Sequence, residues 1–335
     1  MKNIPALIAS FTLAIASTAQ TWDQLPGRPP IPKNNPMTAA KIELGKHLYF
    51  DKRLSKTNEI ACNSCHGVQN AGSGVDNAQF STGINGQKGG RNAPTVWNSA
   101  YSSVQFWDGR ADSLEAQAKG PLTNPVEMGM KDHDEVIKKV AAIPGYVQKF
   151  KEVFPGKDSL TIDHLADAIA AYERTLITPR SPYDRFLKGD KRALSTAAQR
   201  GMKVVEKTGC LSCHSGPMFN GPTMPAGQGF YMKFPTIPGT EYDQKYAFSK
   251  DLGRYEVTHS DADKNTWRIP TWRNVALTAP YFHNGSVATL DEAVRVMAKT
   301  QLGKTLPENE VADVVEFLKS LTGERPAQSA PKTLN

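Results

Sequence analysis

Two Cys-x-x-Cys-His pentads, Cys62 to His66 and Cys210 to His214, contain all four cysteines of the chain. In this pattern both thiols can bond covalently to one haem c, and the histidine that follows can bind its iron. Two Cys-x-x-Cys pairs could instead hold zinc, and one pair could form a redox dithiol, but neither accounts for a histidine after both pairs. The sequence therefore predicts two covalent haems, attached through Cys62, Cys65, His66, Cys210, Cys213 and His214.

Residues 1–19 have the composition of a secretory signal peptide. Lys2 supplies a positive charge, an apolar stretch runs from Ile4 to Ala16, and small residues follow it. No later segment approaches twenty consecutive apolar residues, the length needed to cross a bilayer. Because c-type haems are attached after export, we expect the protein in the periplasm.

The formal net charge of the full chain is +7. Basic runs with interleaved aromatic residues are absent from the sequence, which argues against nucleic acid as a partner. A positive surface suits docking to an acidic electron-transfer protein, but solubility alone would explain the charge equally well.

The chain is predicted to be mainly α-helical and to form two cytochrome c-type domains. Each domain would carry one covalent haem, and long loops would connect its helices. Each pentad follows a helical stretch, at 37–49 and at 195–205. Each pentad also precedes, at nearly equal distance, an amphipathic closing stretch that starts at Leu165 or Val311. We expect an N-terminal domain over 20–178, whose first residues are free to pack on the other domain, a C-terminal domain over 179–325 and a polar tail over 326–335.

Met297 is the candidate second ligand of the C-terminal haem. It lies on a predicted helix that follows Tyr281-Phe282-His283. A thioether stabilises ferrous iron, so a pair of His214 and Met297 would give a high-potential electron-transfer haem. A single methionine is more often a packing residue, and the ligand assignment therefore depends on its context.

That context is similar to the bacterial dihaem cytochrome c peroxidases over almost the whole mature length. The resemblance rests on the two pentads and on segments spread along the chain, at 43–46, 89–95, 105–111, 117–121, 126–128, 274–283, Met297 and 301–304. It implies that the first haem is peroxidatic, with His66 as its proximal ligand, and that the second haem supplies it with electrons.

The resemblance also implies roles for individual residues. Glu127 matches the pocket carboxylate that moves protons between the peroxide oxygens, and Gln117 matches an amide that positions peroxide. Trp107 matches the tryptophan between the two haems. The calcium ligands of the family match Asn92, Thr278 and Pro280, the last two through their carbonyl oxygens, which are donors that suit Ca2+. His283 receives no role beyond structure near the electron-transfer haem.

The function expected from the resemblance is reduction of hydrogen peroxide to water, with electrons from a small cytochrome c or a cupredoxin, by a homodimer. A competing hypothesis is a dihaem oxidase that acts on a protein or quinol, although those enzymes carry tyrosine instead of methionine on the second haem. A dihaem electron carrier without enzymatic activity is a third possibility. It would need neither Glu127 nor Gln117.

One position departs from the family pattern. Many members carry a histidine in the loop before Gly90-Arg91-Asn92, and this histidine blocks the peroxidatic iron in the resting enzyme. Here Ile84 takes its place, and residues 67–132 contain no histidine. We therefore expect an open peroxidatic iron and an enzyme that is active without reductive opening.

Overall fold

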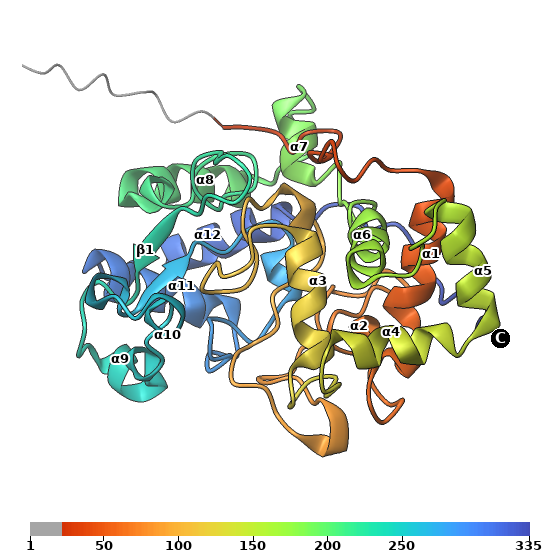
Figure 1. Cartoon of the computed structure of the whole chain (residues 1–335). Coiled ribbons are helices and arrows are strands. Elements are labelled where there is room, and N and C mark those ends of the chain that lie inside the picture. Colours follow the sequence, from red (N-terminus) through yellow and green to blue (C-terminus); the bar gives the residue numbers. More distant parts are fainter. Residues whose placement is uncertain (1–21) are drawn as a thin grey trace, which may run out of the picture.

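The computed structural model describes residues 22–335, so the expected signal peptide lies outside the described residues. The prediction of a mainly helical chain is confirmed (Figure 1). The helices are α1 (Ala39–Phe50), α2 (Cys62–Cys65), α3 (Leu114–Thr123), α4 (His133–Ala141), α5 (Pro144–Val153), α6 (Ile162–Glu173), α7 (Pro182–Leu187), α8 (Thr196–Thr208), α9 (Glu241–Tyr246), α10 (Tyr255–Thr258), α11 (Leu290–Leu302) and α12 (Glu308–Ser320).

Strand structure in the described residues is limited to one short pair and a few isolated bridges. Strands β1 (Tyr231–Lys233) and β2 (Thr266–Arg268) are antiparallel, with Met232 opposite Trp267. Short 3-10 turns punctuate the loops: η1 (Lys52–Leu54), η2 (Ile84–Gly86), η3 (Ser99–Tyr101), η4 (Cys210–Ser212), η5 (Phe248–Lys250), η6 (Asp261–Asp263) and η7 (Val275–Leu277).

The predicted helices around the pentads are present, with starts set by local capping. Thr161 accepts a hydrogen bond from the backbone N–H of His164, so α6 begins a few residues before the expected start at Leu165. Ser195 caps α8 in the same way, through the N–H of Ala198. Pro307 occupies the N-cap position of α12, before Glu308.

Each half of the chain is built on a close crossing of two helices. In the N-terminal half α1 crosses α6, and a Cβ at Gly45 would lie 1.8 Å from the carbonyl oxygen of Ala168. In the C-terminal half α8 crosses α12, and a Cβ at Gly201 would lie 2.0 Å from the carbonyl oxygen of Asp313. Both contacts are possible only without a side chain, so glycine allows the helix that precedes each pentad to touch the helix that closes its domain.

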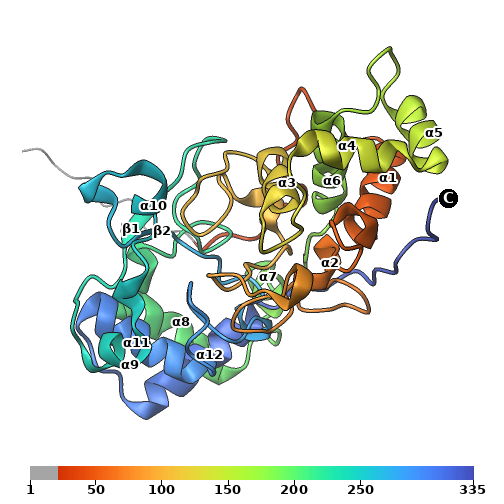
Figure 2. The ribbon, with the colours of Figure 1, turned by 60° about the horizontal axis from the view of Figure 1, so that its bottom comes forward.

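Figure 2 shows the two halves as lobes, with α1, α4, α5 and α6 in one and α8, α9, α11 and α12 in the other. The N-terminal core packs residues such as Leu44, Leu48 and Phe150 around α1 and α6. The C-terminal core packs Val205, Phe317 and others between α8 and α12. The long loops that follow the pentads lie between these cores and form the junction of the lobes.

Both ends of the described part of the chain, residues 22–335, pack on the opposite lobe. The ring of Trp22 lies 5.7 Å from that of Phe317 and 6.2 Å from that of Tyr183, inside the C-terminal core. At the other end the N–H of Gly145 donates to the carbonyl of Asn335, which places the tail beside α5 (Figure 1). The two terminal segments therefore brace the lobes from opposite directions.

No helix within residues 22–335 combines the length and the apolar character that a membrane crossing requires.

The helix crossings generate a stability prediction. Gly201→Ala inserts a methyl group against the Asp313 backbone, which cannot move aside as a flexible side chain can. We expect a loss of about 3 kcal/mol of unfolding free energy, measured by denaturant unfolding followed by circular dichroism. Gly27→Ala is the matched control, because a Cβ at Gly27 has no heavy atom within 4 Å. Equal midpoints for the two variants would show that the crossing tolerates a side chain.

Candidate haem and catalytic cavity

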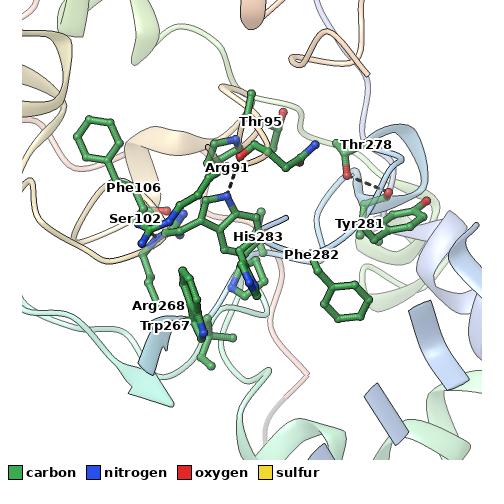
Figure 3. Close-up of a pocket in the computed structure, with 18 of the residues that line it drawn as sticks. Arg91, Thr95, Ser102, Phe106, Trp267, Arg268, Thr278, Tyr281, Phe282 and His283 are labelled. Atoms are coloured by element: carbon green, nitrogen blue, oxygen red, sulfur yellow. Dashed lines mark hydrogen bonds between the residues drawn. The ribbon is translucent and has the colours of Figure 1, made fainter. Parts of the chain in front are cut away.

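A single cavity of about 620 Å³ contains both pentads and is lined by both lobes. Figure 3 shows a part of its wall, to which the N-terminal half contributes Arg91 and Phe106 and the C-terminal half contributes Trp267 and His283. All the residues predicted as haem attachment, catalytic or calcium sites line this cavity: Cys62, Cys65, His66, Asn92, Trp107, Gln117, Glu127, Cys210, Cys213, His214, Thr278, Pro280 and Met297.

The four thiols do not form the single cluster that the zinc alternative would need. They form no disulfide, and no group of three or more His, Cys, Asp or Glu side chains in the described part of the chain is arranged to hold a metal ion. Burial raises the pKa of Cys65 and of Cys210 to about 11, so both groups are neutral thiols when nothing is bound to them. Covalent attachment to a haem is the use that fits the four thiols.

His214 is oriented for binding iron. Its Nδ1 lies 2.9 Å from the carbonyl oxygen of Phe219, so Nδ1–H donates to that oxygen and the lone pair of Nε2 is available. The imidazole also stacks on Trp272, with ring centroids 4.3 Å apart. Burial lowers the pKa of His214 to about 4, which keeps the ring neutral as ligation requires.

His66 lines the same cavity, and one of its ring nitrogens has no hydrogen-bond partner. Its Nδ1 is buried without a hydrogen-bond partner among the described residues, while its carbonyl oxygen accepts from the hydroxyl of Tyr49 at 2.6 Å. Burial lowers the pKa of His66, so the imidazole is neutral. A neutral, buried histidine next to two cavity-lining thiols fits haem c as its partner.

Met297 lies on α11 and faces the cavity from the C-terminal lobe. It packs against the cluster that contains Phe234, Phe248 and Trp267. The structure therefore places His214 and Met297 on the wall of one cavity, as a haem with both ligands requires.

Glu127 lies on a turn after α3 that Asn124 holds. The N–H of Glu127 donates to the carbonyl of Asn124 at 3.1 Å, and the Asn124 side-chain amide donates to Oε1 of Glu127 at 2.7 Å. Burial raises the pKa of Glu127, while the positive charge of Arg110 opposes this rise. The carboxyl group is thus fixed in position and holds a proton to higher pH than an exposed glutamate does.

The loop that carries Ile84 lies directly against the Glu127 turn. The N–H of Ile84 donates to the carbonyl of Glu127 at 3.0 Å, and its side chain is 4% exposed. The Cδ1 atom of Ile84 fills the space that a Cβ at Gly129 would need. Ser81 and Gly83 of this loop line the cavity, whereas the Ile84 side chain is directed onto Gly129 and away from it.

Trp107 and Asn92 meet at the junction of the lobes. The indole N–H of Trp107 donates to the carbonyl of Asn92 at 2.8 Å. The side-chain amide of Asn92 donates to the carbonyl of Ala78 at 2.9 Å, which leaves its Oδ1 for another partner. A cation there would depend on amide and carbonyl oxygens, such as those of Thr278 and Pro280.

The junction contains a repeat that the sequence analysis did not detect. Residues 92–110 and 268–286 align at a separation of 176 positions (268 − 92), with identities such as Pro94 and Pro270, Asn98 and Asn274, and Phe106 and Phe282. The paired positions share unusual backbone: φ is 63° at Asn98 and 62° at Asn274, and 67° at Phe106 and 70° at Phe282. Positive φ is rare for phenylalanine, so its recurrence marks a true structural repeat.

The repeat pairs Trp107 with His283. Two reciprocal backbone hydrogen bonds join the lobes there: the N–H of Asn92 donates to the carbonyl of His283 at 2.7 Å, and the N–H of Arg268 donates to the carbonyl of Trp107 at 2.9 Å. The rings of Trp107 and His283 are 6.4 Å apart, and His283 stacks on Trp267 at 4.1 Å. The signal that could have found His283 is the shared pattern of Phe106-Trp107-Asp108-Gly109 and Phe282-His283-Asn284-Gly285.

Comparison with known proteins identifies the family. The family profile described as "Di-haem cytochrome c peroxidase" matches residues 39–192. The cytochrome c551 peroxidase of Nitrosomonas europaea is 43% identical over 302 residues, which cover 90% of this chain and 86% of that protein. The chain belongs to the dihaem cytochrome c peroxidase family. This membership confirms the resemblance seen in the sequence and implies two haem c groups.

Further relatives extend the match along the chain. The cytochrome c551 peroxidase of Pseudomonas aeruginosa is 41% identical over 335 residues, covering 97% of this chain and 93% of that protein. The crystal structure of a MauG-like protein associated with microbial copper homeostasis has a TM-score of 0.77 at 30% identity, covering 91% of this chain and 96% of that one. The fold of two cytochrome c-type domains is thereby confirmed.

Covalent attachment makes a direct prediction about haem content. Protein denatured in acid acetone should keep two haems per chain, because thioether bonds survive the loss of the fold. Replacing Cys210 and Cys213 together with alanine should leave one retained haem, while the double replacement at Cys62 and Cys65 should leave the other. The measurement is the haem absorbance of the precipitated protein, and haem extracted from the unmodified protein would contradict covalent attachment.

Proposed function

We propose that this protein reduces hydrogen peroxide to water at the haem bound by Cys62, Cys65 and His66. The haem bound by Cys210, Cys213 and His214, with Met297 as its second ligand, relays electrons from a small redox protein. When bound, the first haem supplies an iron that can accept peroxide. The observation that carries the proposal is the position of Glu127, a fixed carboxyl group with a raised pKa in the same cavity as His66.

Glu127 is the proposed acid and base. Cleavage of the O–O bond needs one group that removes a proton from one peroxide oxygen and returns it to the other. The hydrogen bond from Asn124 holds Oε1, which leaves Oε2 free for this exchange. Gln117 lines the same cavity from α3 and can orient peroxide through its amide.

Trp107 is the proposed bridge for electrons. Its indole lies at the junction, held by the carbonyl of Asn92 and by the backbone bond from Arg268. A fixed aromatic ring between two redox centres provides an electronic pathway through the junction. This pathway would connect the Met297 side of the cavity with the Glu127 side.

The position of Ile84 supports an iron that is open in the resting state. Its apolar side chain is buried against Gly129, and the backbone of its loop is bonded to the Glu127 turn. No protein ligand then has to leave before peroxide can bind. We propose that the enzyme is active without prior reduction.

Calcium, partners and location complete the proposal. Asn92, Thr278 and Pro280 are the proposed calcium ligands, supported by the free Oδ1 of Asn92 and by their shared cavity wall. The electron donor is a small cytochrome c or a cupredoxin, the working form is a homodimer, and the location is the periplasm. We place the domain boundary between residues 178 and 179. This position is supported by the helix pairs, because α1 packs on α6 before it and α8 packs on α12 after it.

An oxidase of protein or quinol substrates is the second candidate, because a MauG-like protein shares the fold and 30% of the aligned residues. The two functions differ at the electron-transfer haem. Methionine at position 297 favours relay of single electrons at high potential, whereas a tyrosine ligand would favour more oxidised states of the pair.

The role of Glu127 gives the test of the proposed function. Glu127→Gln keeps the shape of the side chain and removes its ability to exchange a proton, so kcat should fall by about 10²–10⁴. The measurement is peroxide-dependent oxidation of a reduced small cytochrome c. The raised pKa of Glu127 further predicts that kcat/KM declines with falling pH, from a pH above the range of an exposed glutamate.

Glu152→Gln is the matched control, since Glu152 is exposed on α5, outside the cavity wall. It should turn over at the parental rate. Near-parental kcat in Glu127→Gln, with both haems retained, would show that another group transfers the protons.

The Ile84 loop predicts the resting spectrum. The fully oxidised protein should give one high-spin and one low-spin ferric signal in electron paramagnetic resonance, and should bind cyanide without prior reduction. Ile84→His should increase the low-spin fraction, whereas Ile84→Val should leave the spectrum unchanged. Two low-spin signals in the parental protein would indicate another ligand, and would contradict an open iron in the resting state.

A further inference from the structure

Arg268 is a half-buried cation on the cavity wall, and no acidic side chain of the described residues forms an ion pair with it. It projects from β2 into the cavity, and its Nε donates to the carbonyl of Phe106 at 3.0 Å. Its guanidinium forms no ion pair with any residue in 22–335. Burial lowers the pKa of Arg268 to about 10, which reflects the unfavourable transfer of this charge out of water.

The other arginines with largely buried heads are all paired. Arg273 binds Asp184 at 2.9 Å, Arg174 binds Glu115 at 2.8 Å, and Arg91 binds Asp251 at 2.7 Å. Among the cationic side chains of the cavity wall, Arg110 is also paired, with Asp108 at 2.8 Å, and Lys233 is exposed to solvent. A charge that is removed from water is normally compensated in proteins, and Arg268 faces the cavity without such compensation, so it is placed to bind an anion held there.

The repeat at the junction supplies independent support. Arg268 occupies the position equivalent to Asn92, the proposed calcium ligand, at the same point before the paired prolines Pro94 and Pro270. Figure 3 shows its side chain running toward Ser102 and Phe106, and Ser102 is the repeat equivalent of Thr278. The C-terminal half thus places its own side-chain cation where the N-terminal half is proposed to bind a metal cation.

We propose that Arg268 binds a propionate of the peroxidatic haem and raises the reduction potential of that haem. The assignment to this haem follows from Phe106, whose ring packs 3.4 Å from the Cβ position of Gly120 on α3 and 3.5 Å from the guanidinium of Arg110. Gly120 lies on the same helix as Gln117, and Arg110 is close enough to Glu127 for its charge to lower the pKa of that carboxyl group. A guanidinium is well suited to a carboxylate, because its fork of donors can bind both oxygens.

The inference depends on the two haems that family membership implies, and it does not depend on the peroxide reaction. Arg268 is therefore a positioning and charge-compensating residue for the haem. A positive charge next to a propionate disfavours the extra positive charge of ferric iron relative to ferrous iron. Removal of that charge should lower the potential of one haem without changing its covalent attachment.

The experiment is a spectroelectrochemical titration that resolves the two haems in Arg268→Gln, Arg268→Lys and Lys264→Gln. At a fixed potential, the ferrous-to-ferric ratio of the peroxidatic haem should fall about tenfold in Arg268→Gln, equivalent to about 59 mV. Arg268→Lys should restore most of the loss because it keeps the charge. Lys264→Gln is the matched control: it removes an equal charge next to β2 from a side chain that is 45% exposed and paired with Asp261.

A second measurement covers the case in which Arg268→Gln does not fold. The propionate bending bands in resonance Raman spectra report hydrogen bonding to the carboxylate, and they should shift in Arg268→Lys but not in Lys264→Gln. Removal of calcium with a chelator should leave the difference between Arg268→Gln and the parental protein intact. Unchanged potentials in Arg268→Gln, a shift confined to the electron-transfer haem, or unchanged Raman bands in Arg268→Lys would each overturn the proposal.

Discussion

The buried hydroxyl of Thr178 ties the two repeated halves of this protein together. It accepts hydrogen bonds from the side-chain amides of Asn98 and Asn274, at 2.7 and 2.9 Å, and all three residues are almost fully buried. The same two asparagines begin the equivalent turns η3 and η7. Thr178, which lies between the lobes, therefore holds the loops that contain η3 and η7 in position. Both loops line the cavity, so its shape depends on this shared contact.

Thr178 also connects the end of the chain to the junction. Oδ1 of Asn274 accepts from the N–H of Gly323, and a Cβ at Gly323 would lie 2.0 Å from the carbonyl oxygen of Thr178. The tail that follows can then cross to the N-terminal lobe, where its last residue meets α5. A short buried network of amides, one hydroxyl and one glycine thus determines where the lobes meet.

Local sequence signals located the helices that flank the haem pentads. The stretches expected at 37–49 and 195–205, and those expected to start at Leu165 and Val311, agree with α1, α8, α6 and α12 to within a few residues. The family motifs selected four residues that all line one cavity: Gln117, Glu127, Trp107 and Met297. Their roles remain proposals. These features depend on residues close in sequence or on whole motifs, and sequence reasoning can use both.

The junction was not predicted because its repeat is short and carries different residues at the positions that matter for function. Trp107 and His283 differ chemically, and so do Asn92 and Arg268, yet each pair has the same backbone setting. A positive φ at Phe106 and Phe282 leaves little trace in composition. The contact of Trp22 with Phe317 is similarly invisible, since it joins residues from opposite ends of the chain.

The equivalence of Asn92 and Arg268 has a consequence for how the two halves respond to their surroundings. A guanidinium is covalently part of the chain and keeps its charge in any buffer, whereas a site built from amide and carbonyl oxygens can lose its ion to the solution. The two halves would then share a backbone conformation, but only the positive charge of Arg268 would be permanent. Depletion of divalent ions would remove the positive charge beside Asn92 and leave the positive charge of Arg268 unchanged.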